Sequence, residues 1–222
     1  MPPQILGDAA HPISLIMNNT DVIAPRLVPE IKLHLANEDL PLYRAGESEL
    51  AALGIGIPYW AFAWSGGQAL ARYVLDNPEV VADKRVLDFG AGSGLVAIAV
   101  AKAGATEVTA ADIDPLAVEA MNLNCALNDV EFDTTMDDLI GIDDGWDPLL
   151  VGDVCYDKTI ADRLLPWLRS LASAGRTVLI GDPGRFILRD QGLETIASYR
   201  AETTCIMEDS DLRNARVWQF AG

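Results

Sequence analysis

The chain has 222 residues, enough to bury the core of one domain, and half of them are hydrophobic, which excludes disorder over most of its length. It carries 33 acidic against 16 basic side chains, a formal net charge of −17. Such a surface repels phosphate backbones, so we expect no nucleic-acid substrate. Acidity also serves solubility, but it favours a partner that presents positive charge, such as a lysine side chain.

The sequence contains no apolar run of the roughly 18 residues that a membrane helix needs. Residues 1–19 resemble neither a signal peptide nor a transit peptide. The cysteines Cys125, Cys155 and Cys205 lie far apart, which is typical of reduced, buried side chains that bind no metal and form no disulfide. We therefore expect a cytoplasmic protein without membrane spans or a metal site.

The first part of the chain, residues 1–57, is expected to form an extension that packs on the main domain, 58–222. Residues 13–36 combine a helical pattern with two prolines, which predicts a short helix followed by an irregular or extended segment. A loop rich in aromatic residues and glycine, 54–68, then leads into a helix near 69–75.

From residue 85 onward, predicted strands and helices alternate. Strands are expected at 85–89, 107–111, 130–134, 146–154, 176–182 and 214–222. Helices are expected at 95–103, within 112–128 with Asp114 as its cap, at 158–175 and within 186–199. This alternation predicts an α/β fold with a doubly wound, mostly parallel sheet and helices on both faces. The last strand can pair antiparallel, as edge strands of such sheets sometimes do.

A glycine-rich turn follows the first of these strands, in the run RVLDFGAGSGLVAIAV. Gly90, Gly92 and Gly94 do not match Gly-x-Gly-x-x-Gly, the dinucleotide pattern, because position 95 is leucine. Asp88 precedes the first glycine by two residues, and its charge would repel a diphosphate and attract a cation. The turn therefore favours S-adenosylmethionine, which carries a sulfonium and an ammonium group and no phosphate.

Other acids stand where such a cofactor needs acceptors. Asp112 ends the second strand about 20 residues after Gly90, the spacing expected for a carboxylate that binds the ribose hydroxyls. Asp137 or Asp138 follows the next strand and is a candidate acceptor for the adenine amino group. Gln68 begins a helix, whose N-terminal amides suit the cofactor's carboxylate. Each acid has the alternative role of a helix cap or turn former.

The ordered segments VLDFGAGSG, VTAADIDP, DDLIG and LLVGDVCYD resemble the seven-stranded class I methyltransferases. RLVPEIKLHLA (26–36), PYWAFAWSGGQALARYVLDNP (58–78) and GDVCYD (152–157) narrow this resemblance. Over nearly its full length the chain is similar to the protein lysine methyltransferases that modify the β subunit of electron-transfer flavoprotein, including their bacterial members. Related enzymes often have phenylalanine where this chain has Cys155.

The resemblance implies that the substrate is a lysine side chain and that Asp153 and Tyr156 are catalytic, with Asp153 accepting a hydrogen bond from the amine. A lysine amine must be neutral to attack, and an apolar pocket lowers its pKa. Trp60 and Phe62 are candidates for the walls of that pocket, and Trp64 for a wall shared with the cofactor. These three rings have the alternative role of core or loop-anchoring residues.

Other functions remain open at this stage. The same fold serves methylation of a ribosomal protein or a small molecule, because a fold does not fix a function. A catalytically silent protein that binds the cofactor and a partner is another alternative. A nicotinamide-dependent dehydrogenase is disfavoured by the position of Asp88.

Overall fold

The computed structural model describes residues 11–202 and 212–221. Its large sheet is built from β3 (Arg85–Phe89), β4 (Glu107–Ala111), β5 (Asp133–Thr135), β6 (Leu149–Gly152), β7 (Val178–Asp182), β8 (Leu193–Glu202) and β9 (Leu212–Phe220). These seven strands lie in the order β5-β4-β3-β6-β7-β9-β8. The strands β3 to β7 pair in parallel, and β9 is antiparallel to both of its neighbours. The predicted α/β fold with a mostly parallel sheet is confirmed.

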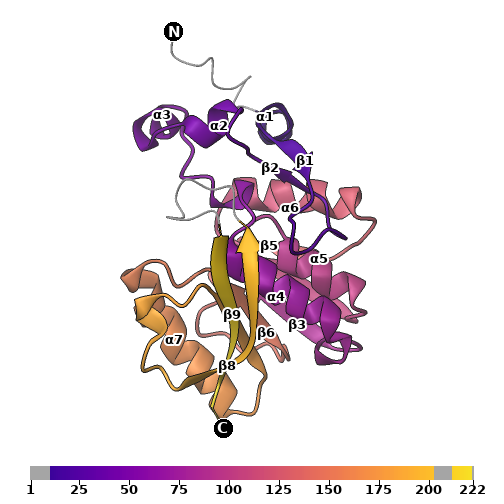
Figure 1. Ribbon diagram of the computed structural model, residues 1–222, viewed down its shortest axis with the longest axis vertical. Coiled ribbons are helices and arrows are strands. Elements are labelled where there is room, and N and C mark those ends of the chain that lie inside the picture. Colours follow the sequence, from indigo (N-terminus) through magenta and orange to yellow (C-terminus); the bar gives the residue numbers. More distant parts are fainter. Residues whose placement is uncertain (1–10, 203–211, 222) are drawn as a thin grey trace.

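Helices cover both faces of this sheet (Figure 1). One face packs against α4 (Ser65–Asp76), α5 (Leu95–Lys102) and α6 (Pro115–Leu127), and the other against α7 (Lys158–Ser173). The helix α5 is apolar on every side, since residues 95–100 are all apolar and all buried. A helix that is enclosed between the sheet and its neighbouring helices requires this pattern. The central strands β6 and β7 are buried on both faces for the same reason.

The last third of the sheet differs from the prediction. The segment 186–199 was expected to carry a helix, but it contains only a short 3-10 turn, η3 (Phe186–Leu188), followed by strand β8. Asp190 and Gly192 have φ values of +59° and +69°, which a helix cannot contain. The strand β8 then pairs along its length with β9. Consequently β9 is antiparallel but internal, and β8 is the edge strand.

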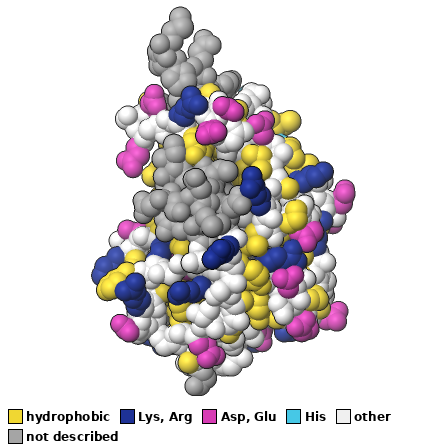
Figure 2. All heavy atoms as spheres, in the orientation of Figure 1, with side chains coloured by type: hydrophobic (Ala, Val, Ile, Leu, Met, Phe, Trp, Pro, Cys, Tyr) yellow, Lys and Arg dark blue, Asp and Glu magenta, His cyan; other side chains and the backbone are white. Residues whose placement is uncertain are grey.

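The strands β8 and β9 carry exposed arginines, although the whole chain is acidic. Arg200 and Arg216 are exposed on these strands. Figure 2 shows Lys and Arg side chains, in dark blue, across the middle of this face, with acidic side chains around them. Charged side chains on an edge oppose pairing with a second sheet.

The N-terminal part of the chain forms small elements beside α6. These are α1 (Pro12–Asn19), β1 (Asp21–Ile23), β2 (Leu33–Leu35), α2 (Pro41–Arg44), α3 (Glu47–Ala52) and η1 (Tyr59–Ala61), with η2 (Pro78–Val80) following α4. The strands β1 and β2 form an antiparallel pair. The predicted short helix and extended segment over 13–36 are thereby confirmed.

Asn124 of α6 and Asn128, the residue that caps its C-terminus, fasten the segment around β2 to the main sheet domain. Asn124 is fully buried; its Oδ1 accepts the N–H of His34 at 2.8 Å, and its Nδ2 donates to the carbonyl of Ser93 at 2.8 Å. Asn128 pairs with both backbone groups of Lys32, at 3.0 and 2.6 Å. Through Asn124, the N-terminal segment is connected to the glycine-rich turn itself.

Between residues 85 and 182 the expected elements agree with the structure, whereas α4 begins at Ser65, inside the segment 54–68 that is expected to be a loop. The strand β5 begins three residues later than expected, at Asp133. Asp114 caps α6, as predicted, with its side chain accepting from Leu116 N at 2.8 Å. Cys125 and Cys155 are free thiols, and Cys205 lies outside the described residues. In the described ranges, no helix is long and apolar enough to cross a membrane.

Candidate functional site

The glycine-rich turn joins β3 to α5 in a conformation that needs glycine. Gly90, Gly92 and Gly94 have φ values of +68°, +53° and +78°. A Cβ on Gly90 would lie 2.4 Å from a methyl carbon of Val154. Because the side chains are absent, the backbone of the turn closely approaches the loop after β6.

Asp88 lies beneath this turn and is fully buried. Its Oδ2 accepts the N–H of Ala97 at 2.9 Å, so it satisfies a free donor in the first turn of α5. Burial raises the pKa of Asp88 to about 7, although the bond from Ala97 opposes this shift. Asp88 is therefore a weaker source of negative charge than the sequence predicts, and its repulsion of a diphosphate is correspondingly smaller.

Asp112 fastens the glycine turn from the end of β4. Its Oδ2 accepts the N–H of Gly92 at 2.8 Å, and its Oδ1 accepts the N–H of Asp114 at 3.0 Å. Burial raises its pKa. Each carboxylate oxygen has a second lone pair, so Asp112 keeps acceptor positions for a ligand hydroxyl.

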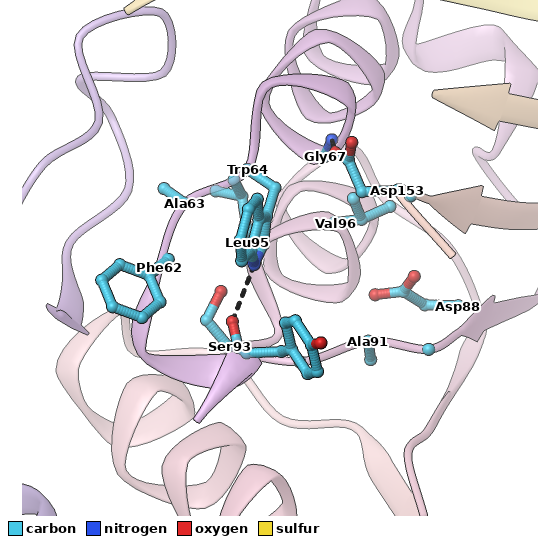
Figure 3. A pocket seen from close by; sticks show the side chains of 14 residues that line it. Phe62, Ala63, Trp64, Gly67, Asp88, Ala91, Ser93, Leu95, Val96 and Asp153 are labelled. Atoms are coloured by element: carbon cyan, nitrogen blue, oxygen red, sulfur yellow. Dashed lines mark hydrogen bonds between the residues drawn. The ribbon is translucent and has the colours of Figure 1, made fainter. Parts of the chain in front are cut away.

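A cavity of about 740 Å³ opens beside these groups, at the carboxyl ends of β3, β4 and β6. Because β4 and β6 pair with opposite edges of β3, this is the point where strand order reverses, the position at which open α/β sheets bind ligands. A smaller pocket of about 50 Å³ adjoins it and shares Tyr59, Trp64, Gly90, Gly92, Gly152 and Asp153 (Figure 3).

Aromatic rings form one wall of the cavity. Trp64 lines both spaces, and its Nε1 donates to the carbonyl of Tyr59 at 2.8 Å. The ring of Tyr59 stacks on Tyr156, with centroids 5.0 Å apart. Tyr156 is half-exposed. Trp64 and Tyr156 are expected site residues, whereas Tyr59, which joins them, was not predicted, although it stands inside the aromatic run PYWAFAW.

Trp60 and Phe62 lie deeper than the other rings. Trp60 is 1% exposed, belongs to the core beneath η1 and still lines the large cavity. Phe62 is 5% exposed, packs between Tyr43 and Trp64 at 5.9 Å from each ring, and lines the small pocket. Both rings therefore support the site from within the core, and their contact with a substrate stays a prediction.

The N-terminus of α4 approaches β7 through glycine. A Cβ on Gly66 would lie 2.3 Å from the carbonyl oxygen of Gly181. The next residue, Gly67, donates its N–H to Asp153 Oδ2 at 2.8 Å. Gln68 is buried, donates from its side chain to the carbonyl of Ala63 at 2.7 Å, and is not among the residues that line either cavity. The side chain of Gln68 therefore lines neither cavity. The role predicted at the cofactor's carboxylate rests on the backbone N–H groups at the start of α4.

Asp153 follows β6 and lies at the junction of the two cavities. It is buried, has a φ of +57°, and accepts from Gly67 N–H and from Arg185 Nη1, the latter at 2.8 Å. Figure 3 shows Asp153 beside Gly67, on the same side of the pocket as Asp88. Burial raises the pKa of Asp153 to about 6, and Arg185 opposes this shift. The cap of α7 is Asp157, so Asp153 does not cap this helix.

Asp137 and Asp138 lie at the other end of the large cavity, after β5. Asp138 forms an ion pair with Arg163 and accepts the N–H of Ile140 at 3.2 Å, and the bond from Arg163 lowers its pKa. Asp137 accepts from the hydroxyl of Thr135 at 2.8 Å. Both acids line the cavity, so the structure leaves the choice between them open.

The sheet order, the glycine turn after the first parallel strand and the acid at the end of the second define a class I methyltransferase, an enzyme class that uses S-adenosylmethionine. The lining fits this cofactor, since carboxylates and aromatic rings suit hydroxyl groups and a positively charged sulfur.

Comparison with known proteins narrows the class. A family model described as ribosomal protein L11 methyltransferase (PrmA) matches residues 68–177. The electron transfer flavoprotein beta subunit lysine methyltransferase of Xenopus laevis is 42% identical over 96% of this chain and 88% of its own length. The human enzyme of that name is 38% identical over 93% and 81%. This chain therefore belongs to the family of electron transfer flavoprotein beta subunit lysine methyltransferases.

Solved structures agree on the fold. The magnesium protoporphyrin IX methyltransferase from Synechocystis, with bound SAH, has a TM-score of 0.53 and 17% identity, covering 81% of this chain and 91% of that one. At this identity the likeness concerns the fold alone. The resemblance expected from the sequence motifs is confirmed by the curated relatives.

Proposed function

We propose that this protein methylates lysine side chains of the electron-transfer flavoprotein β subunit, with S-adenosylmethionine as the methyl donor. The observation that carries the proposal is Asp153 with Tyr156 at the cavity beside the glycine turn, in a chain that is 42% identical to a methyltransferase named for that substrate. When bound, S-adenosylmethionine supplies a methyl group on a positively charged sulfur. The reaction then requires a neutral amine held in line with that group.

The end of β4 and the glycine turn would hold the cofactor. Asp112 has acceptor positions for the ribose hydroxyls, and Asp137 or Asp138 for the adenine amino group. Gly90, Gly92 and Gly94 let the backbone approach the ligand without side chains in the way. Trp64 offers a ring face to the positive sulfur.

The loop after β6 would hold the target lysine. Asp153 keeps one acceptor position on each oxygen and can take a hydrogen bond from the amine. Tyr156, Tyr59 and Trp64 surround the approach with rings, which removes water and lowers the pKa of the lysine. Cys155, the residue before Tyr156, is buried in the core between the sheet and α7, and burial raises the pKa of its thiol to about 12, so it remains a neutral, space-filling side chain.

The acidic surface supports a basic protein partner and disfavours nucleic acid. The formal charge of −17 attracts a segment rich in lysine and repels phosphates. We further propose that the protein acts in the cytoplasm, in keeping with the absence of a disulfide at the two cysteines among the described residues, Cys125 and Cys155.

Mass spectrometry of a purified flavoprotein β subunit tests the proposal. Incubation with the enzyme and S-adenosylmethionine should add mass in steps of one methyl group. The Asp153→Ala variant should lose this activity and retain cofactor binding by calorimetry. No mass gain with wild-type enzyme, or an unaltered yield with Asp153→Ala, contradicts the assignment.

A second candidate substrate is a ribosomal protein, because the L11 methyltransferase family model covers residues 68–177. That match includes the glycine turn and β6 but not the aromatic segment around Trp64. Labelling a whole lysate with methyl-labelled donor separates the candidates. A labelled ribosomal protein without a labelled flavoprotein favours the second, labelled metabolites alone favour a small-molecule enzyme, and cofactor binding with no labelled product favours a silent binding protein.

A further inference from the structure

A partly buried arginine and two buried carboxylates form a cluster next to the candidate lysine site. Nη1 of Arg185 donates to Asp153 Oδ1 at 2.8 Å and to Asp182 Oδ2 at 2.7 Å. The side chains of Asp153 and Asp182 are 7% and 0% exposed, and that of Arg185 is 24% exposed. Arg185 also lines the large cavity together with Asp153 and Tyr156. The cluster therefore reaches the site and is not confined to the core.

Strand register and a tight turn build this cluster. Gly152 pairs with Gly181, so the residues that follow them, Asp153 and Asp182, leave neighbouring strands at the same level. Asp182 Oδ1 accepts the N–H groups of Gly184 and Arg185, each at 2.7 Å, and this turns the chain back toward β6. The segment GDPGR (181–185) therefore brings the side chain of Arg185 to Asp153, at the end of the neighbouring strand β6.

Asp153 is held at both of its oxygens by different parts of the fold. Oδ2 accepts from Gly67 at the N-terminus of α4, and Oδ1 accepts from Arg185 in the loop after β7. Two fixed bonds define the plane of the carboxylate, and each oxygen keeps a second acceptor position. Without Arg185, only the bond to Gly67 would orient the group.

The same arrangement keeps Asp153 charged although it is buried. Burial raises the pKa of this carboxyl to about 6, and Arg185 and the N–H of Gly67 oppose the shift. The other titratable groups that face it are Asp182, which raises its pKa, and the thiol of Cys155. Removing the guanidinium would leave two buried carboxylates side by side, and one would take up a proton. A protonated Asp153 is a poorer acceptor for an amine.

We infer that Arg185 is a positioning residue for methyl transfer, which holds Asp153 ionised and oriented toward the target amine. The inference rests on the proposed function, since it assumes that Asp153 receives the lysine. Arg185 has a second consequence there: its positive charge disfavours an ammonium ion close to Asp153 and so favours the neutral amine that attacks.

Arg185→Met tests the inference, with Arg185→Lys as the conservative variant. We expect the methionine variant to lose at least about tenfold in kcat, with KM for the protein substrate changed by less than about threefold, because orientation and not binding is lost. The acid limb of its pH–rate profile should move up by about 1–3 pH units, the range for loss of a neighbouring opposite charge. Arg185→Lys should restore the position of the limb.

Arg169→Met is the matched control. Arg169 is an exposed arginine of α7 that bonds to Gln191, away from both cavities. It should keep the wild-type profile. A reduced rate in Arg185→Met with an unmoved acid limb overturns the inference and assigns Arg185 a structural role. If the acid limb of Arg185→Lys lies at the same pH as that of Arg185→Met, the inference is also contradicted.

Thermal unfolding of the protein without cofactor or substrate gives an independent measurement. The pKa of Asp153 in Arg185→Met should exceed the wild-type value of about 6, so the variant should lose midpoint temperature relative to wild type as pH rises above 6. A difference that is constant from pH 5 to 8 overturns the inference. If the methionine variant does not fold, Arg185→Gln, which removes the charge and keeps N–H donors, takes its place in the same measurement; a difference from wild type that grows above pH 6 supports the inference, and a constant difference overturns it. Wild-type enzyme that leaves the flavoprotein unmethylated refutes the proposed function, whereas the unfolding result still reports on the pair.

Discussion

The two halves of the site are built in different ways. At the ends of β3 and β4, Asp88 and Asp112 accept hydrogen bonds from backbone N–H groups within 20 residues of each acid. At the end of β6, Asp153 is held by Gly67, 86 residues away, and by the side chain of Arg185, 32 residues away. The half around Asp88 and Asp112, which would hold the cofactor and is called the cofactor half below, therefore depends on local backbone geometry. The half around Asp153, which would hold the target lysine and is called the acceptor half, depends on the packing of distant segments.

Asp88→Asn should give the largest effect and tests the cofactor half. The pKa of Asp88 is about 7 in the folded protein and near 3.8 in the unfolded chain, so wild type loses stability as pH rises from about 4 to 7. Asparagine does not ionise and can still accept from Ala97. The stability of the variant relative to wild type should rise by about 1.4 kcal/mol per pH unit over this interval and stay constant above it. Urea unfolding at several pH values measures this, and a difference independent of pH contradicts it.

Gly66→Ala should follow and tests the acceptor half. The new Cβ would lie 2.3 Å from the carbonyl oxygen of Gly181 and 2.6 Å from Asp153 Oδ2, so α4 must move away from β7. We expect a loss of about 3 kcal/mol in the free energy of unfolding, together with most of the methylation activity. Gly67→Ala is the matched control, because its Cβ would meet no atom within 4 Å. Equal stabilities of the two variants would contradict the close approach.

Asp112→Ala should weaken the cofactor half without affecting the acceptor half. It removes the acceptor for Gly92 and the acceptor positions proposed for the ribose, at roughly 1.5–3 kcal/mol for bonds to a charged group. Calorimetry with S-adenosylmethionine should show a loss of roughly 10- to 100-fold in affinity. Asp114→Ala removes the cap of α6 and leaves Asp112 in place, so it should cost about 1 kcal/mol in stability and change affinity far less than Asp112→Ala, although Asp114 also lines the cavity. An equal loss of affinity in both variants would mean that Asp112 acts only on α6.

Tyr156→Ala should have the smallest effect. It tests the exposed aromatic wall of the acceptor half separately from the buried Asp153. The half-exposed ring stacks on Tyr59, and such aromatic pairs contribute about 0.5–1.5 kcal/mol. We expect KM for the protein substrate to rise by about 2- to 12-fold and the thermal midpoint to stay unchanged. Tyr156→Phe keeps the stacking and should retain the wild-type KM. A loss of rate in the phenylalanine variant as large as in alanine would instead assign a role to the hydroxyl group.

The same contrast explains what could be predicted from the sequence. The glycine turn, Asp112 and the capped helix α6 follow from residue spacing within one βαβ unit, and the structure confirms their arrangement. The environment of Asp88 was not predicted, because a motif gives the position of an acid and not its burial. Its hydrogen bond to Ala97 directs it toward α5.

In the acceptor half, the sequence indicated Asp153 and Tyr156 but not what holds them. The partners Gly67, Arg185 and Tyr59 come from three other segments, and only the assembled sheet brings them together. The strand β8 was mistaken for a helix for a related reason. Its identity is set by pairing with β9, and the only local signal was Asp190 with Gly192, which end the preceding turn.

Asn124 and Asn128, at the C-terminal end of α6, have a consequence for any shortened form of this chain. A truncated protein that starts at residue 58 would lack β2, and Asn124 would keep its bond to Ser93 but lose the backbone donor of His34. Leu42 and Leu50, which are 2% and 3% exposed, would be removed from the cluster that covers Trp60. We expect such a fragment to be poorly soluble and to hold its glycine-rich turn less firmly. A shortened protein for engineering therefore has to begin before β2.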